Sequence, residues 1–188
     1  GGNAYTDSET VSNLASEEGG MVTLFAQWRA NHYTIRFDGN TADGGSTLDQ
    51  PMTYDQAASL TTNGYTKTGY TFMDWNTQPN GGGTAYTDGE TVSNLTSAEG
   101  ETVTLYAQWR ANNYTIRFDG NTADGGSTLD QPMTYDQAAS LTINGYTKTG
   151  YTFTSWNTQA DGGGTTYTDG QNVSNLTPEE GGTVTLFA

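Results

Sequence analysis

Acidic and amide side chains recur in a glycine-rich loop in a pattern that could bind calcium. The residues with suitable oxygens are Asp38, Asn40, Asp43, Asp119, Asn121 and Asp124. Calcium takes six to eight oxygen ligands, and this loop lacks the terminal glutamate of the EF-hand pattern. Asp, Asn and Gly are also the residues that close tight turns. We therefore expect turn chemistry here and no cofactor, with calcium as the alternative.

The other titratable residues do not form a recognisable catalytic set. The only histidine, His32, is replaced by Asn113 where the sequence repeats. No set of serine, histidine and carboxylate can be assembled from the pattern. The only lysines, Lys67 and Lys148, could each form an isopeptide bond with an asparagine, although a solvated turn residue is the simpler interpretation. We therefore expect that the protein is not an enzyme.

The tryptophans and tyrosines could form a surface on which sugars stack. Trp75 and Trp156 are the candidate exposed pair, because strand alternation places them on the face opposite Phe72 and Phe153. However, aromatic residues at strand spacing usually belong to a core. A small module that is poor in leucine and isoleucine needs its aromatic residues there, so we expect a core role for most of them.

The candidate residues come in pairs because the chain repeats itself every 81 residues. Residues 33–61 match residues 114–142 letter for letter, and such a long period indicates tandem modules. We call residues 31–111 the first module and residues 112–188, which are nearly a complete repeat, the second module. Residues 1–30 correspond to the end of a preceding repeat. We interpret the chain as part of a longer array, and expect residues 1–30 to become ordered only through the next module or another chain.

The hydrophobic pattern of the first module predicts strands joined by turns. Strands are expected at residues 33–37, 48–54, 69–76, 84–87 and 102–109. The last strand should point its alternating apolar residues, up to Trp109, into the core. Segments 55–60 and 88–95 are expected to form single helical turns, the second with Asp88 as its N-cap. Only residues 110–113 separate this module from the next, which favours a semi-rigid array.

Three blocks of the module resemble a known family. Residues 33–38 read Tyr-Thr-Ile-Arg-Phe-Asp, residues 69–76 read Gly-Tyr-Thr-Phe-Met-Asp-Trp-Asn, and residues 103–109 read Val-Thr-Leu-Tyr-Ala-Gln-Trp. This arrangement is similar to the Listeria–Bacteroides repeat, the B-repeat of internalin-type surface proteins, and the resemblance covers the whole chain. It implies a mainly β (α+β), β-grasp-like module that is repeated in tandem in bacterial surface proteins and adhesins. It supplies no catalytic residues.

The charge of the chain limits its partners. The formal net charge is −15, from 21 acidic and six basic residues. Nucleic acid is disfavoured because phosphate binding needs clustered lysine and arginine, and an anionic membrane surface is disfavoured for the same reason. No apolar run approaches the length needed to insert into a membrane, and the absence of cysteine excludes disulfides.

These observations favour a non-enzymatic structural segment, a stalk or fibre, of an extracellular protein on the bacterial cell surface. Its partners would be neighbouring repeats of the same or another chain. One alternative is a multivalent adhesin that binds host glycans or proteins through repeated weak sites. Another is a subunit that assembles into a filament or surface layer through exposed strand edges.

Overall fold

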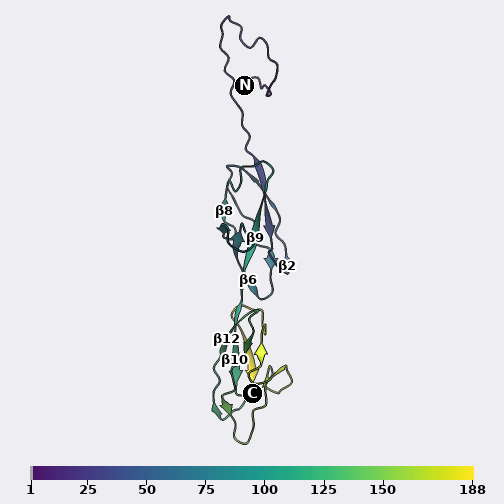
Figure 1. Cartoon of the computed structure of the whole chain (residues 1–188), viewed down its shortest axis with the longest axis vertical. Coiled ribbons are helices and arrows are strands. Elements are labelled where there is room, and N and C mark those ends of the chain that lie inside the picture. Colours follow the sequence, from purple (N-terminus) through teal and green to yellow (C-terminus); the bar gives the residue numbers. More distant parts are fainter. Residues whose placement is uncertain (1) are drawn as a thin grey trace. The chain divides into compact units, whose positions relative to one another are not determined.

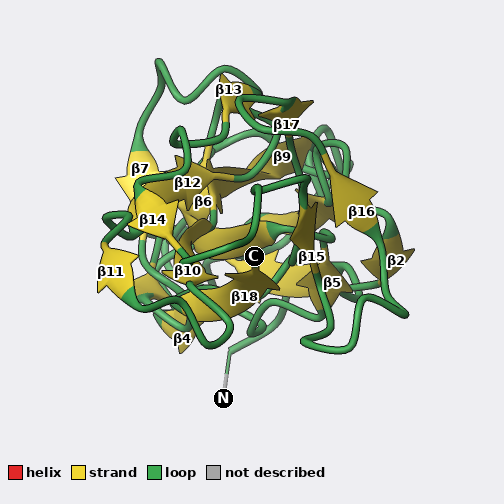
Figure 2. Ribbon diagram, turned by 90° about the horizontal axis from the view of Figure 1, so that it is seen from below, coloured by secondary structure: helices red, strands yellow, loops and turns green. Residues whose placement is uncertain are grey.

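The computed structural model describes residues 2–188, and these form strands and loops without a helix (Figures 1 and 2). They fall into two compact units, one that ends at Ala30 and one from Asn31 to Ala188. Residues 2–30 contain no strand, and Met21, Phe25 and Trp28 are exposed there. How this segment becomes ordered therefore stays a prediction.

Short strands alternate with turns throughout both modules. Those of the first module are β1 (His32–Asp38), β2 (Gly44–Gly45), β3 (Gln50–Thr53), β4 (Ala58–Ser59), β5 (Tyr65–Thr66), β6 (Tyr70–Asn76), β7 (Ala85–Tyr86), β8 (Thr91–Val92) and β9 (Thr102–Ala111). Those of the second module are β10 (Asn113–Asp119), β11 (Gly125–Gly126), β12 (Gln131–Thr134), β13 (Ala139–Ser140), β14 (Tyr146–Thr147), β15 (Trp156–Asn157), β16 (Thr166–Tyr167), β17 (Asn172–Val173) and β18 (Gly182–Phe187).

Each module is built on one five-stranded mixed sheet. The order is β3-β1-β9-β6-β7 in the first module and β12-β10-β18-β15-β16 in the second. The first and last long strands, β1 and β9, lie side by side and parallel, from Thr34 opposite Thr102 to Asp38 opposite Tyr106. Their outer neighbours β3 and β6 are antiparallel to them. The expected strand at 48–54 is thus confirmed only in its middle, as β3.

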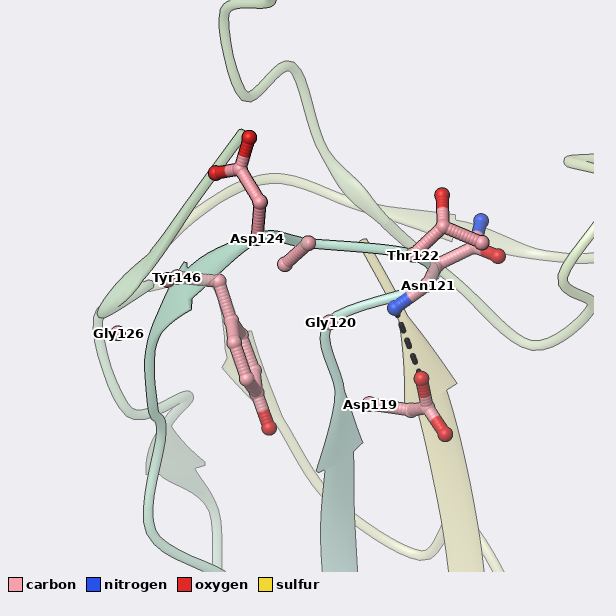
Figure 3. Close-up of a pocket in the computed structure, with 9 residues that line it drawn as sticks. Asp119, Gly120, Asn121, Thr122, Asp124, Gly126 and Tyr146 are labelled. Atoms are coloured by element: carbon pink, nitrogen blue, oxygen red, sulfur yellow. Dashed lines mark hydrogen bonds between the residues drawn. The ribbon is translucent and has the colours of Figure 1, made fainter. Parts of the chain in front are cut away.

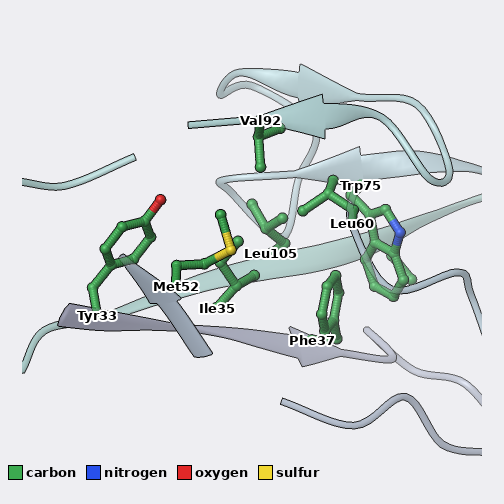
Figure 4. Packing of buried hydrophobic residues seen from close by; sticks show 9 residues of the cluster. Tyr33, Ile35, Phe37, Met52, Leu60, Trp75, Val92 and Leu105 are labelled. Carbon is green, nitrogen blue, oxygen red and sulfur yellow. The ribbon is translucent and has the colours of Figure 1, made fainter. Parts of the chain in front are cut away.

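The predicted alternation of the first and last strands is confirmed. Tyr33, Ile35 and Phe37 of β1 are buried, as are Leu105 and Ala107 of β9. They pack against Met52, Leu60, Trp75 and Val92, which completes the core (Figure 4). The second module repeats this cluster around Ile116, Trp156 and Leu186. Aromatic rings therefore fill much of a core for which the module has few aliphatic residues.

The expectation of Trp75 and Trp156 as an exposed aromatic pair is wrong, because both side chains are 0 % exposed. The pairing of β6 with β9 shifts between Phe72 and Asp74. This β-bulge inserts one extra residue and so reverses the alternation beyond it. Trp75 consequently lies on the same side as Phe72, with ring centroids 5.1 Å apart, and also packs on Phe37 at 4.7 Å.

The two expected helical turns are also wrong, since both segments form strands that pair with each other. Ala58 of β4 lies opposite Val92 of β8 in a separate two-stranded sheet. Asp55 has a φ of 63°, which is incompatible with a right-handed helix. Its backbone N–H donates to Asn94 Oδ1 at 2.6 Å. This side-chain contact fixes the turn, so the α part of the predicted α+β class is absent from residues 2–188.

Candidate functional site: the junction between the modules

The predicted calcium ligands lie in turns whose oxygens accept backbone hydrogen bonds. Asp38 Oδ1 accepts from the Asn40 amide at 2.7 Å, and Asp43 Oδ2 accepts from the Thr68 amide at 2.7 Å. The latter bond lowers the pKa of Asp43. Asn40 donates through Nδ2 to the Ala107 carbonyl at 2.8 Å, which ties the loop to β9.

The second copy of this loop surrounds a shallow polar hollow of about 370 Å³. Asp119 Oδ1 accepts from the Asn121 amide at 2.8 Å, whereas Asp124 lies on a different side of the loop (Figure 3). Asp124 Oδ2 instead accepts from the Thr149 amide at 2.7 Å. Within residues 2–188, no three histidine, cysteine, aspartate or glutamate side chains gather as metal ligands.

We propose that these loops are closed by turn chemistry without calcium. Millimolar calcium is therefore expected to leave the melting temperature unchanged, whereas Asp38→Ala is expected to lower it equally with calcium and with chelator, because the lost bond to Asn40 is internal. Differential scanning calorimetry checks both. A rise in melting temperature with calcium, lost when Asp38 and Asp119 are both replaced by alanine, would restore the calcium interpretation.

His32 and the two lysines also make contacts within the modules. His32 Nδ1 lies 3.2 Å from Thr53 Oγ1, and Asn113 accepts from Thr134 Oγ1 at the equivalent place. Lys67 donates to Thr41 Oγ1 at 2.8 Å and lies over the Tyr70 ring. Lys148 makes the same contacts with Thr122 and Tyr151. Each ammonium group thus contacts a hydroxyl and a ring rather than an amide. The isopeptide bond stays an untested alternative.

The residues that join one module to the next form a polar site with hydrogen bonds to both modules. Asn112, which is only 6 % exposed, lies between β9 and β10. Its backbone N–H donates to the Gly69 carbonyl at 2.8 Å, and its Oδ1 accepts from Thr71 Oγ1 at 2.6 Å. Both of these partners belong to the first module.

The other two polar groups of Asn112 bind the second module. Its carbonyl accepts from the Tyr135 amide at 2.8 Å, and its Nδ2 donates to the Pro178 carbonyl at 2.7 Å. All four hydrogen-bonding groups are therefore used, two on each side. Because buried polar groups must find partners, any movement of one module relative to the other would leave some of these groups unsatisfied.

A turn of the first module packs directly on the second. The Tyr70 ring meets the Tyr135 ring edge-on with centroids 6.0 Å apart, and the Tyr70 hydroxyl donates to Asp136 Oδ2 at 2.8 Å. Gly69 has a φ of +76°, and a Cβ added there would lie 2.2 Å from the Tyr135 ring. Glycine is thus required both by the backbone conformation and by the neighbouring module.

An ion pair lies beside these contacts. Arg110 Nη2 is 3.1 Å from Glu180 Oε1, while Glu180 Oε2 accepts from the Asn113 amide at 2.8 Å. Both side chains of the pair are more than a third exposed, so its contribution to stability is small. We call Gly69, Tyr70, Thr71, Arg110, Asn112, Asn113, Tyr135, Asp136, Pro178 and Glu180 the junction.

Two carboxylates of the junction, Asp136 and Glu180, have lowered pKa values. Hydrogen bonds from Asn175 and then Tyr70 lower the pKa of Asp136 below its ordinary 3.8, with the Lys67 charge adding to the effect. Hydrogen bonds from Asn113 and Arg110 lower the pKa of Glu180 below its ordinary 4.5. A carboxylate whose pKa is lower in the folded state stabilises it above the ordinary pKa, and loses that contribution as pH falls through the folded value. The junction should therefore weaken below about pH 4.

Tyr70→Phe is expected to raise the pKa of Asp136 towards 3.8, because it removes one donor to the ionised carboxylate. Carboxyl carbon NMR across a pH titration measures this shift. Asp124 is the control, because its pKa is lowered by Thr149 within the second module and should not respond. An unchanged Asp136 would mean that the Tyr70 hydroxyl does not reach across the junction in solution.

Sequence reasoning found the connector but missed the junction. It treated residues 110–113 as a short spacer, and it treated Tyr70 as part of a strand. The available signal was Asn112, a polar residue between two strongly alternating strands. Its partners are distant in sequence, however, and only the folded modules bring them together.

Comparisons with known proteins place both modules in one group. The model of the family described as "Listeria-Bacteroides repeat domain" matches residues 33–108 and 114–188. The chain is 36 % identical over 132 residues to a protein described as a Gly-rich membrane protein of Evansella cellulosilytica, covering 69 % of this chain and 14 % of that protein. It is 30 % identical over 177 residues to Internalin H of Listeria monocytogenes, covering 85 % of this chain and 29 % of that protein.

The chain thus spans less than a third of the length of these curated relatives. No solved structure matches it. Within residues 2–188, no helix is long and apolar enough to cross a membrane.

Proposed function

Because the chain belongs to the Listeria–Bacteroides repeat family, we propose that it is a structural segment, a stalk or fibre, of a bacterial cell-surface protein. The observation that carries this proposal is Asn112, whose four polar groups bind two modules at once. A junction of this kind transmits orientation from one module to the next. A segment that holds other domains away from a cell needs that property.

The names of the relatives support the location. Two are described as membrane proteins and one as an internalin, and the family occurs in surface proteins. We propose an extracellular position on this basis. The neighbouring repeats are then the principal partners, and no enzymatic role is proposed, because the candidate catalytic residue His32 makes the same kind of contact as Asn113.

The sheet order supports the finer proposal of a β-grasp-like module. In it, the first and last long strands are central and parallel, and each is flanked by an antiparallel strand. The likeness to a β-grasp fold would be limited to the sheet, because β4 and β8 occupy the segments where helical turns were expected.

Backbone ¹⁵N relaxation of the full chain tests the stalk proposal, because it reports how fast each module tumbles. We expect residues 31–188 to tumble as one body. Gly69→Ala should separate the modules, since its methyl group meets the Tyr135 ring. Gly150→Ala is the matched control: its φ is +78°, but a Cβ there has no neighbour within 4 Å. Two independently tumbling modules in the unmodified chain would refute the proposal.

A further inference from the structure

The chain contains three places where glycine directly follows asparagine, and they differ in their surroundings. The pairs begin at Asn63, Asn80 and Asn144. In such a pair the glycine amide nitrogen can attack the side-chain amide carbon of the asparagine, because glycine has no Cβ to obstruct the approach. The attack closes a succinimide ring and releases ammonia. The structure indicates which of the three pairs has the freedom to react in the folded chain.

The turn at Asn63 holds both reacting groups in place. Asn63 is half-buried, its Nδ2 donates to the Tyr65 carbonyl at 3.1 Å, and its Oδ1 accepts from the Tyr65 amide at 2.9 Å. The Gly64 N–H donates to Thr47 Oγ1 at 2.9 Å, and Thr47 is itself buried. Ring closure requires the Gly64 N–H to leave this hydroxyl, so the turn must open before it can react.

The second module repeats this arrangement around Asn144. Its Nδ2 and Oδ1 bind the Tyr146 carbonyl and amide at 3.1 and 2.9 Å. Gly145 donates to Thr128 Oγ1 at 2.9 Å, and Thr128 is buried. The chain therefore contains two copies of an Asn-Gly pair that is restrained in the same way.

The loop around Asn80 restrains its pair much less. Asn80 is exposed. Its Oδ1 accepts from the Gly82 amide at 3.0 Å, and its Nδ2 makes no hydrogen bond within residues 2–188. The Gly81 N–H donates to the Gln78 carbonyl at 3.1 Å, and Gln78 belongs to the same exposed turn. A small local opening is therefore enough to free the Gly81 nitrogen.

The Gly82 amide also favours the reaction. When the Gly81 nitrogen attacks the side-chain carbon of Asn80, negative charge develops on Oδ1, and an N–H already directed at that oxygen stabilises it. The Tyr65 amide has the same relation to Asn63. The pairs therefore differ in how firmly they are held, and not in this activation.

The second module shows that the loop accommodates an aspartate in place of Asn80. Asp161 occupies the equivalent position, and its Oδ1 accepts from the Gly163 amide at 2.9 Å. The glycine that follows has the same conformation in both modules, since Gly81 and Gly162 each have a φ of +76°. The turn thus keeps its form when the side-chain amide is replaced by a carboxylate.

We propose that Asn80 is a site of deamidation in the folded chain and that Asn63 and Asn144 are protected from it. Hydroxide removes the proton of the Gly81 nitrogen, which bonds to Cγ of Asn80. The bond from Cγ to Nδ2 breaks, and ammonia leaves with a proton from water, which restores the hydroxide. A second water opens the succinimide to aspartate or isoaspartate. Either product adds one negative charge to the net −15.

Peptide mass spectrometry of the full 188-residue chain, incubated in mildly alkaline buffer, tests the proposal. We expect deamidation at Asn80 to be at least about tenfold faster than at Asn63 and Asn144, because the restrained pairs react only through opened states. In concentrated urea, where the turns are open, the three pairs should react at similar rates. Asn80→Asp should abolish the fast release of ammonia from the folded chain.

Thr47→Val tests the cause of the protection, because it removes the acceptor of the Gly64 N–H. Deamidation at Asn63 should become faster, whereas Asn144, which keeps Thr128, is the matched control within the same molecule. An unchanged rate at Asn63 would overturn the role assigned to Thr47. If this variant does not fold, the three rates in the unmodified chain still decide.

Two results would overturn the proposal as a whole. One is an Asn80 that stays intact in the folded chain over a time in which it reacts in urea. The other is an equal rate at all three pairs in the folded chain. Neither result affects the relaxation test of the stalk, because the loop around Asn80 is not part of the junction.

Discussion

Trp75→Ala is expected to lower the free energy of unfolding of the first module by about 3–5 kcal/mol, the cost of removing a large aromatic side chain from a core. Trp75 is fully buried and its ring contacts Phe37, Tyr65 and Phe72. Loss of the indole leaves a cavity that these rings cannot close. Urea unfolding followed by the amide NMR signals of residues 31–111 measures the loss.

Trp109→Ala is the comparison. Trp109 is half-buried at the edge of the same core, so about 1–3 kcal/mol is expected from the smaller area removed from contact. Strand alternation alone would predict the reverse order, because it directs Trp109 inward and Trp75 outward. A greater loss for Trp109→Ala would show that the bulge after Phe72 is absent in solution.

Asn112→Ala is expected to cost about 2–3 kcal/mol, because it leaves the Thr71 hydroxyl and the Pro178 carbonyl without their partners. Asn31→Ala, the matched control, removes a single bond to the Ser97 carbonyl and should cost about 0.5–1 kcal/mol. Both variants lose the bond that the asparagine makes with its following module. The difference between the two losses therefore gives the contribution of the contact between Asn112 and Thr71 of the preceding module.

Calorimetry can separate the two effects of Asn112→Ala. We expect the coupled unfolding of the modules to divide into two transitions, because the side-chain link between them is lost. Asn31→Ala should retain the coupling. Equal losses for both variants would indicate that the Thr71 contact carries no stability and that the junction is held by other groups.

Local pattern was enough to predict the long strands. In β1, alternation agrees with burial residue by residue. In β9 it agrees in the middle of the strand, where Leu105 and Ala107 are buried. Pattern failed where one residue changes the geometry. The bulge between Phe72 and Asp74 reverses the alternation, and the left-handed Asp55 replaces a helical turn by β4. The residue types at the bulge and at position 55 do not by themselves predict these backbone conformations.

The junction was beyond prediction for a different reason. Asn112 binds Gly69 and Pro178, which lie on opposite sides of it and far away along the chain. Only the folded sheets bring those carbonyls within reach of one side chain. The turn residues were more predictable, because Asp38 and Asn40 act on their immediate neighbours. Local hydrogen bonds can be inferred from residue type, whereas contacts between modules require the register of both sheets.

The parallel pairing of the first and last long strands has a mechanical consequence. When the chain is stretched, tension enters the first module at the start of β1 and leaves at the end of β9. In a parallel pair these points lie at opposite ends, so the load acts along the strands. The bonds from Thr34–Thr102 to Asp38–Tyr106 are then sheared together instead of opening one after another. The β10–β18 pair repeats this arrangement, so each module acts as a clamp in series along the loaded chain.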